Sequence, residues 1–402
     1  MSRMFRSLRT RNYRIWAAGA VVSNIGTWMQ RTAQDWLVLT ELTQHDARAV
    51  GIVMALQFGP QLVLLPWTGL AADRLERRRL LLATQAIMGA LALLQGALSV
   101  TGAIRLWQVD LIALLFGCAA AFDAPARHTF VAELAGERDL ANAVALNSTS
   151  FNAGRMIGPA AAGLCIAALG TGWAFVLNGL SFVAVLISLR FLRREELFAV
   201  ARAGRGRFGL LQGIGYVARR RDLATISLML FLIGTFGLNF PIYISTMAVR
   251  VFAAGPGGYG LLTSAMACGT IAGSLLAARR EQPSLILLPL GAGLFGLFCA
   301  AAALAPSYWA FALALALLGA AAITFSNSSN SLMQLRTDPA MRGRVIAIRL
   351  ALTLGGTPIG APLVGWVANT AGPRWALGVG AAAGFAAALV GAISFARGDQ
   401  GA

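Results

Sequence analysis

Residues 69–79 read Gly-Leu-Ala-Ala-Asp-Arg-Leu-Glu-Arg-Arg-Arg, a dense run of charge that separates two apolar segments. Six of these eleven residues are ionisable. The run cannot lie in the hydrocarbon of a bilayer, because each charge would cost several kcal/mol there. It is therefore predicted to form a short, solvated hairpin between two buried helices.

The overall composition indicates a membrane protein. The chain has 402 residues, of which 57% are hydrophobic and only 12% are charged, whereas a soluble protein carries about 25% charged residues. A net charge of +17 would favour nucleic-acid binding in a soluble chain. In a chain this apolar the basic residues instead report topology, so membrane lipid is an expected partner and nucleic acid is not.

Arginine is sorted along the chain, which contains no lysine. Most arginines fall in alternate loops. The exceptions are Arg48, Arg105, Arg250 and Arg374 in the other loops, and Arg31, Arg155 and Arg349 within apolar segments. By the positive-inside rule, this bias places both termini in the cytoplasm of a multi-pass protein of the cell (plasma or inner) membrane.

Twelve apolar segments approach the length of about 20 residues that a membrane-spanning helix needs. They cover residues 14–40, 49–71, 80–101, 106–126, 141–169, 172–192, 223–250, 257–278, 284–305, 307–334, 341–370 and 374–396. The predicted fold class is thus an all-α polytopic membrane protein with twelve transmembrane helices.

One long polar break divides these helices into six and six. The predicted domains are an N-terminal six-helix bundle (1–192), a cytoplasmic linker (193–222) and a C-terminal six-helix bundle (223–402). Within the linker, one helical face carries Leu210, Leu211, Ile214 and Val217, which predicts an amphipathic helix on the inner leaflet. Pro159 and Pro362 lie 203 positions apart in similar surroundings and favour an internal repeat of the two halves.

Polar residues form one stripe on the first predicted helix. Asn24, Trp28, Arg31 and Asp35 are spaced by four, three and four residues, so they share a helix face. That face must meet protein or water. Asp35 could be a titrating carboxylate for proton coupling, modulated by Arg31; equally, the two could form a structural ion pair near the outer end of the helix.

The fifth predicted helix combines small residues with a buried charge. Its run contains Asn152, Gly154, Arg155, Gly158, Pro159 and Gly163. The glycines would let another helix approach closely, and the proline permits a bend. The arginine lies near the middle of the span and therefore needs a partner or a wet cavity. Roles in coupling, in substrate binding or in a fixed pair all remain open for it.

The pattern Gly-x-x-x-Asp-Arg-x-x-Arg-Arg resembles the signature loop between helices 2 and 3 of the major facilitator superfamily of secondary transporters. Its residues here are Gly69, Asp73, Arg74, Arg77 and Arg78, and Glu76 stands where that family usually has Gly. The Gly-x-x-x-Gly-Pro run of the fifth helix resembles the motif of drug and proton antiporters in the same superfamily. The segments 23–26, 35–39, 123–127 and 342–345 are similar to the branch of enterobactin-exporter-like transmembrane secretion effectors.

This resemblance implies a major facilitator fold with a gate and a central cavity. The gate would bring Asp73 to the start of the eleventh helix, at Asp338, Arg342 and Arg344. The cavity would be lined by the first, fourth, seventh and tenth helices. Its candidate contacts are Asn24, Trp28, Asn152, Phe236, Asn239, Tyr243, Asn327, Asn330 and Gln334.

Enzymatic chemistry is not expected. His45 and His128 both fall in predicted loops, the four cysteines lie singly, and a Walker loop is impossible without lysine. We therefore expect no catalytic residue, metal or cofactor. The predicted function is export of a small amphipathic molecule (drug, siderophore or metabolite) by a monomeric secondary transporter using proton antiport and alternating access. A lysophospholipid or lipid flippase of the same superfamily and a non-transporting membrane sensor or scaffold are the alternatives.

Overall fold

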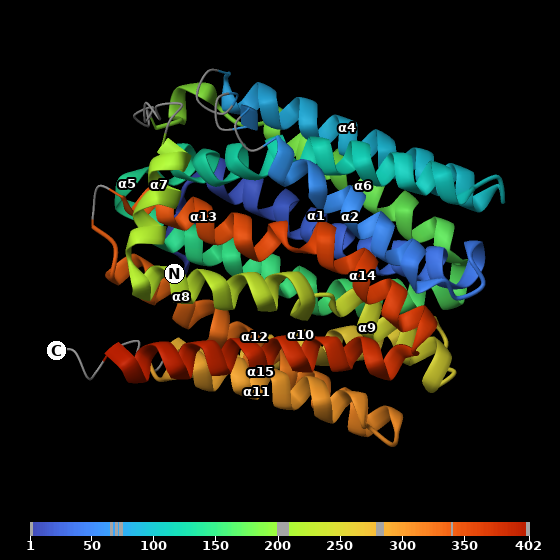
Figure 1. The fold of residues 1–402 in the computed structure, drawn as a ribbon. Helices are drawn as coiled ribbons and strands as arrows, with labels where there is room; N and C mark the ends of the chain where they lie inside the picture. Colours follow the sequence, from blue (N-terminus) through green and yellow to red (C-terminus); the bar gives the residue numbers. More distant parts are fainter. Residues whose placement is uncertain are drawn as a thin grey trace. The chain divides into compact units, whose positions relative to one another are not determined.

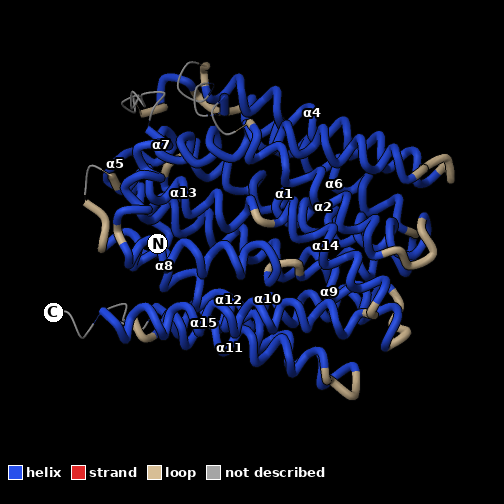
Figure 2. The backbone as a smooth tube through the Cα atoms, in the orientation of Figure 1, coloured by secondary structure: helices blue, strands red, loops and turns tan. Residues whose placement is uncertain are grey.

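A computed structural model describes residues 3–64, 67, 68, 71, 75–198, 209–278, 285–338 and 341–398. All regular secondary structure in these ranges is helical (Figure 2). The chain divides into two compact units. The first comprises Met1–Leu42, Gly59–Gly204 and Pro256–Ser264, and the second comprises Thr43–Phe58, Arg205–Gly255 and Ala265–Ala402.

The first unit is built on long helices and short helical turns (Figure 1). The long helices are α1 (Arg11–Trp36), α4 (Arg77–Val100), α5 (Leu106–Leu169) and α6 (Thr171–Arg190). The short turns are the 3₁₀ turns η1 (Arg3–Arg9) and η3 (Arg194–Glu196) and the π-helical turn η2 (Leu37–Leu42). The first residues of α10 (Pro256–Ala278) also belong to this unit.

Helix α5 joins the predicted fourth and fifth helices. The sequence predicts a loop at 127–140, but these residues are helical except at Gly136, whose φ of 68° and ψ of 169° break the helix. A positive φ favours glycine because other residues meet a steric penalty there. The prediction of a loop was wrong because a fall in apolar character marks the end of the stretch suited to hydrocarbon and not the end of a helix, and the chain stays helical on both sides of Gly136.

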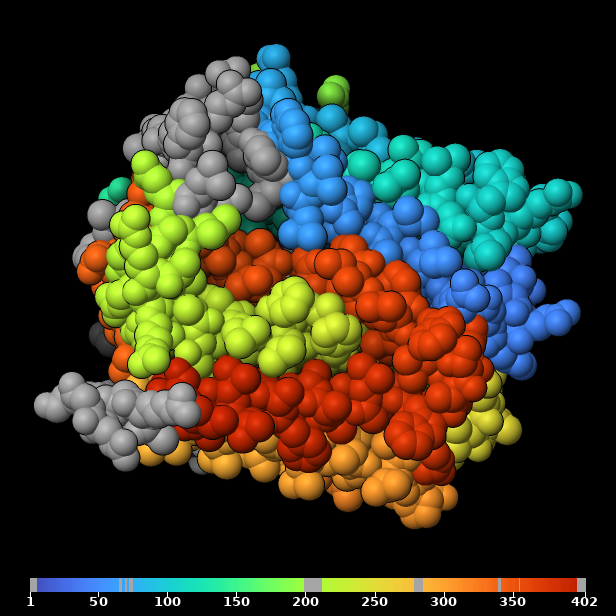
Figure 3. Space-filling view, in the orientation of Figure 1, coloured from blue at the N-terminus to red at the C-terminus, as the bar shows by residue number. Residues whose placement is uncertain are grey.

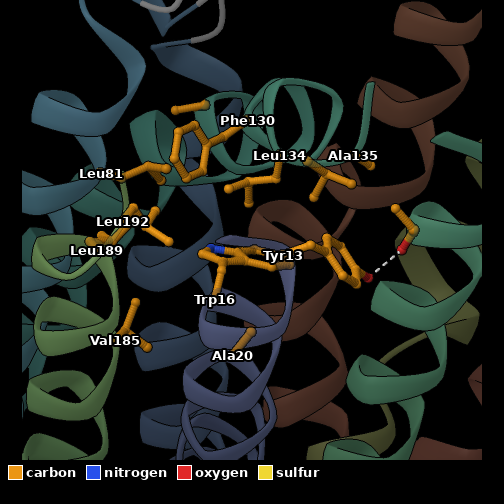
Figure 4. Close-up of a cluster of buried hydrophobic side chains, with 13 residues drawn as sticks. Tyr13, Trp16, Ala20, Leu81, Phe130, Leu134, Ala135, Val185, Leu189 and Leu192 are labelled. Atoms are coloured by element: carbon orange, nitrogen blue, oxygen red, sulfur yellow. Dashed lines mark hydrogen bonds between the residues drawn. The ribbon is translucent and has the colours of Figure 1, made fainter. Parts of the chain in front are cut away.

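A buried apolar cluster holds the first unit together. Tyr13 and Trp16 of α1 pack with Leu81 of α4, Phe130 of α5 and Leu189 of α6 (Figure 4). The hydroxyl of Tyr13 donates a hydrogen bond of 2.9 Å to the carbonyl oxygen of Ala143. Helices in a membrane associate through close packing of this kind, so the cluster anchors the first half of α1.

The second unit contains the part of α10 after Ser264 and the remaining helices, except that residues 59–63 at the end of α2 belong to the first unit. The remaining helices are α2 (Ala47–Val63), α7 (Gly209–Arg219), α8 (Arg221–Leu232), η4 (Ile233–Gly237), α9 (Phe240–Thr246), η5 (Met247–Val251), α11 (Leu287–Ala303), α12 (Tyr308–Leu335), α13 (Arg342–Gly355), α14 (Thr357–Thr370) and α15 (Pro373–Gly398). The predicted seventh helix is thus interrupted by π-helical turns, and the predicted eleventh is divided at Gly355 and Gly356.

Equivalent contacts occur around the two prolines that the sequence pairs. In the first unit, a Cβ atom on Gly260 of α10 would meet the carbonyl of Pro159. In the second unit, a Cβ atom on Gly51 of α2 would meet the backbone of Ala361 and Pro362. In both places a glycine at the start of one helix lets the backbone approach the bend of another.

Helix α7 packs against α13 within the second unit (Figure 3). A Cβ atom on Gly213 would lie 3.0 Å from the Cβ of Arg344. Val217, from the predicted apolar face, is buried, whereas Ile214 is 50% exposed. The side chains of Leu210 and Leu211 lie outside the described residues. Part of the face predicted to contact lipid is therefore covered by the chain itself.

Eight helices or joined helices of the described residues are long and apolar enough to cross a membrane. They are Arg77–Val100, Leu106–Leu169, Thr171–Arg190, Arg221–Val251, Pro256–Ala277, Tyr308–Leu335, Arg342–Thr370 and Pro373–Phe395. The chain is a multi-pass membrane protein. Helix α1 is not among the eight, although it has 26 residues, and it carries a stripe of polar side chains.

Candidate functional site

The polar stripe of α1 meets a charged residue of α5. The guanidinium carbon of Arg31 lies 4.9 Å from the centre of the Trp28 ring, and that of Arg155 lies 5.6 Å from it. Phe151 packs edge-to-face on Trp28, with ring centres 5.6 Å apart. Two guanidinium groups from different helices thus share one indole ring, which is the geometry of a cation–π interaction.

Two glycines of α5 make this meeting possible. A Cβ atom on Gly158 would lie 2.6 Å from the Cβ of Trp28, and one on Gly154 would lie 2.8 Å from the backbone carbon of Asn24. Real side chains cannot approach so closely. The glycines of the predicted antiporter-like motif therefore set the distance between α1 and α5. The third, Gly163, faces the backbone of Pro256 and Gly257 at the start of α10.

Asp35 lies one helical turn beyond Arg31 and is bonded to α10. The hydroxyl of Tyr259 donates a hydrogen bond of 3.1 Å to Oδ2 of Asp35. The ring of Tyr259 stacks on Trp36, with centres 6.1 Å apart and planes at 25°. Arg31 interacts electrostatically with both Asp35 and Arg155. The carboxylate of Asp35 thus accepts a hydrogen bond from Tyr259 on α10 and lies near the cation Arg31 on its own helix, α1.

We call this group of side chains the Trp28 cluster. It comprises Asn24, Trp28, Arg31, Asp35, Ser150, Phe151, Arg155 and Tyr259. The amide of Asn24 joins it by donating a 2.9 Å hydrogen bond to the hydroxyl of Ser150. Trp28, Arg31, Asp35 and Arg155 are half-buried. With Asp35 ionised, the cluster holds two positive charges and one negative charge.

Sequence reasoning did not identify Tyr259. It lies in the run Pro-Gly-Gly-Tyr-Gly at 256–260, in which a single large polar ring follows two glycines at a helix start. Only 1% of Tyr259 is exposed. The neighbouring glycines permit close approach to another backbone. They were the feature of the sequence from which burial of the Tyr259 ring could have been predicted.

Asn152 is not brought into the cluster. Its amide donates a 2.9 Å hydrogen bond to the carbonyl of Ser148 on its own helix.

The charged hairpin was predicted as a gate, and Gly69, Asp73 and Arg74 lie outside the described residues. Arg77 and Arg78 are both buried. Arg77 forms an ion pair with Glu133 of α5. Nε of Arg78 donates a 2.8 Å hydrogen bond to the carbonyl of Leu189, and its Nη2 donates to that of Arg190 at 3.1 Å. These two arginines therefore fasten α4 to its neighbours, and Arg78 satisfies carbonyls at the end of α6.

A second buried network lies nearby, around Asp123 of α5. Its Oδ1 accepts hydrogen bonds from Thr84 at 2.9 Å and from Gln85 at 2.7 Å. Its Oδ2 accepts two bonds from the guanidinium of Arg127, at 3.0 and 2.7 Å. The carboxylate is thus fully engaged in joining α4 to α5.

The predicted gate residues of the second unit, Asp338, Arg342 and Arg344, contact other residues of that unit. The hydroxyl of Tyr216 on α7 donates a 3.0 Å hydrogen bond to Oδ2 of Asp338. Arg342 donates to the carbonyl of Thr337 at 3.3 Å, and Nη1 of Arg344 lies 2.9 Å from Sδ of Met341. Residues 339 and 340 lie outside the described residues, and α13 begins at Arg342.

The predicted cavity residues of the second unit differ in their exposure. Asn239, at the break before α9, and Tyr243, within α9, are both fully buried. Asn239 donates a 2.8 Å hydrogen bond to the carbonyl of Thr235, and Tyr243 donates one to that of Phe236. In this conformation they stabilise the break. On α12, Asn327 and Asn330 are half-buried and Gln334 is exposed.

Arg349 was noted in the sequence but given no role. It is buried on α13, and its Nη2 donates to the carbonyl oxygen of Ser326 on α12 at 2.8 Å and lies 2.9 Å from the Ser326 hydroxyl.

The many apolar helices of the described residues, with a charged and aromatic cluster held among them, define a multi-pass membrane protein. The family model described as transmembrane secretion effector matches residues 2–398, so the chain belongs to this family of major facilitator transporters. Members of the family and the relatives below are transporters and not enzymes.

Several curated proteins are similar in sequence. The multidrug efflux pump Tap of Mycolicibacterium fortuitum is 26% identical over 372 residues, which cover 88% of each chain. The enterobactin exporter EntS of Salmonella typhimurium is 27% identical over 82% of this chain and 79% of that protein. The staphyloferrin A transporter of Staphylococcus aureus is 30% identical, but the match spans only 41% of this chain and 42% of that protein.

The fold also matches solved structures. A bacterial homologue of the human lysosomal transporter Spinster, in its inward-facing and unoccupied conformation, matches with a TM-score of 0.73. The match covers 96% of this chain and 95% of that chain at 14% identity. At this identity the likeness shows the fold alone.

Proposed function

We propose that this protein exports a small amphipathic molecule by proton antiport with alternating access. The observation that carries this proposal is the setting of Asp35. Its carboxylate lies on a helix enclosed by apolar helices, accepts a hydrogen bond from Tyr259 and interacts with Arg31. Ionisable groups at such positions are rare in membrane helices and commonly serve ion or substrate pathways.

Protonation of Asp35 would change the Trp28 cluster in a way that a coupled transporter needs. It removes the one negative charge that offsets Arg31 and Arg155, so the net charge of the cluster rises by one. It also removes the acceptor that best matches the Tyr259 hydroxyl. The protonated and ionised forms therefore differ in charge and in hydrogen bonding, and a substrate can bind them with different affinity.

The aromatic groups of the cluster suit an amphipathic substrate. Trp28 offers an apolar ring beside two guanidinium groups, and Phe151 is 47% exposed. Asn24 adds an amide that is already hydrogen-bonded to Ser150. Two relatives carry the names multidrug efflux pump and enterobactin exporter. Those names support export as the direction of transport.

We further propose that the protein is a monomer with twelve membrane-spanning helices, in six-helix bundles at 1–192 and 223–402 joined by the linker 193–222. Both termini would lie in the cytoplasm. The distribution of arginine supports this topology.

The proposal can be tested with purified protein in liposomes that enclose a pH-sensitive dye. Ethidium and Hoechst 33342 serve as amphipathic probes. We expect addition of a transported probe to move protons in the opposite direction, and Asp35→Asn to abolish this movement. Asp110→Asn, a carboxylate of α5 outside the cluster, is the matched control and should retain coupling. Proton-independent movement of labelled lysophospholipid would instead favour a flippase, and absence of any flux would favour a sensor.

A further inference from the structure

Helix α10 starts in one unit and continues into the other. Residues Pro256–Ser264 belong to the first unit, and the residues after Ser264 belong to the second. Tyr259 therefore lies on the short part of α10 that packs with α1 and α5. Its hydroxyl is the contact between this part and the carboxylate of Asp35.

Three contacts between α10 and the backbone of α5 or its glycines fix the position of Tyr259. Gly163 of α5 faces the backbone of Pro256, and Gly260 faces the carbonyl of Pro159. The hydroxyl of Ser264 donates a 2.8 Å hydrogen bond to the carbonyl of Met156. These contacts lie before, beside and after Tyr259 along α10. The register of α10 against α5 therefore determines where the phenol is placed.

The phenol is further held by its ring. Trp36 stacks on it from α1, and Tyr259 is 99% enclosed, with 1% exposed. A ring fixed in this way directs its O–H at one acceptor without a large loss of side-chain freedom on bonding. The charged groups that also act on Asp35 are Arg31, on the same helix, and, through Arg31, Arg155 of α5.

We propose that Tyr259 is a positioning residue for proton coupling, whose hydrogen bond favours the ionised form of Asp35 only while α10 keeps its register against α5. A donor to a carboxylate stabilises the charged form relative to the neutral acid. Movement of α10 along α5 would withdraw the phenol and leave Asp35 with a greater affinity for protons. The bond thus links the position of a helix to a protonation state, and this inference rests on the proposed role of Asp35.

The test compares two tyrosines that are both buried and both donate one hydrogen bond. Tyr259→Phe removes the donor to Asp35, and Tyr13→Phe removes a donor to a backbone carbonyl at the other end of α1. Each variant is reconstituted in phosphatidylcholine vesicles and titrated with pH while infrared difference spectra are recorded. The carboxyl band that disappears in Asp35→Asn reports Asp35 itself.

We expect Tyr259→Phe to raise the pH at the titration midpoint of this band by about one unit, which is a tenfold tighter binding of the proton. The reason is that a hydrogen bond to a charged group is worth roughly one pH unit or more. Tyr13→Phe should leave the midpoint in place. An unchanged midpoint in Tyr259→Phe, an equal rise in Tyr13→Phe, or a wild-type spectrum without any band lost in Asp35→Asn would each overturn the proposal.

The titration uses neither substrate nor gradient, so its result is separate from that of the transport assay. A shifted midpoint with no antiport in liposomes would retain the role of Tyr259 and remove the proposed function. Antiport in liposomes with an unshifted midpoint would retain the proposed function and remove the role of Tyr259.

Discussion

Replacing Asp123 by alanine should strongly destabilise the first unit. The carboxylate is 5% exposed and accepts four hydrogen bonds, from Thr84, Gln85 and two nitrogens of Arg127. The substitution leaves the side chain of Arg127, which is only 21% exposed, without its counter-ion. It also leaves the buried amide of Gln85 without this acceptor, whereas the hydroxyl of Thr84 can still donate to the carbonyl of Leu81.

The size of the effect follows from this burial. Removing one partner of a buried ion pair costs about 3–5 kcal/mol. Because Arg127 keeps some contact with solvent, we take the lower end, about 3 kcal/mol. This corresponds to a roughly hundredfold change in the folding equilibrium, since about 1.4 kcal/mol is tenfold. Asp123→Asn, which retains one acceptor oxygen for α4, should fall between alanine and wild type.

The assay is unfolding by sodium dodecyl sulfate in mixed micelles, followed by tryptophan fluorescence. The matched control is Glu76→Gln, because Glu76 pairs with Arg79 on the surface, with side-chain exposures of 42% and 74%. Exposed pairs contribute at most about 1 kcal/mol. If Asp123→Ala lost no more free energy of unfolding than Glu76→Gln, the argument that the Asp123 network ties α4 to α5 would be refuted.

Further predictions concern helix packing and the linker helix. Gly158→Ala places a methyl group 2.6 Å from the Cβ of Trp28, so it should destabilise the protein by about 1–3 kcal/mol. Gly215→Ala in α7 meets no atom within 4 Å and should be neutral or slightly stabilising in the same unfolding assay; equal losses would contradict the packing argument. Tyr216→Phe removes the hydroxyl bonded to Asp338 and should increase hydrogen exchange in α7 severalfold, whereas unchanged exchange would show that this bond does not hold the helix.

Helix spacing and composition were sufficient to predict much of the first unit. The predicted spans 80–101 and 172–192 lie close to α4 (Arg77–Val100) and α6 (Thr171–Arg190). The spacing of Trp28 and Arg31 on one helix face predicted that this face meets protein or water, and it does meet Arg155 of α5. These features depend on helical periodicity, which is local in sequence.

Contacts between distant segments could not be predicted in the same way. The bond between Asp35 and Tyr259 joins residues 224 positions apart, and no local pattern encodes it. Arg77 and Arg78 show that the burial of a charged side chain is also difficult to predict from the sequence. Their charge predicts contact with water, yet both are buried because Glu133 and the carbonyls at the end of α6 provide partners. Whether a charged side chain is solvated or enclosed depends on such tertiary partners.

The central claim is that Asp35 couples proton movement to export, and one pair of fluxes in liposomes tests it most directly. Wild type and Asp35→Asn are compared for probe exchange without a gradient and for uphill probe transport driven by a pH gradient. We predict that Asp35→Asn retains exchange, because substrate contacts remain, and loses uphill transport, because the proton-carrying group is gone. Uphill transport at the wild-type rate in Asp35→Asn would contradict the account.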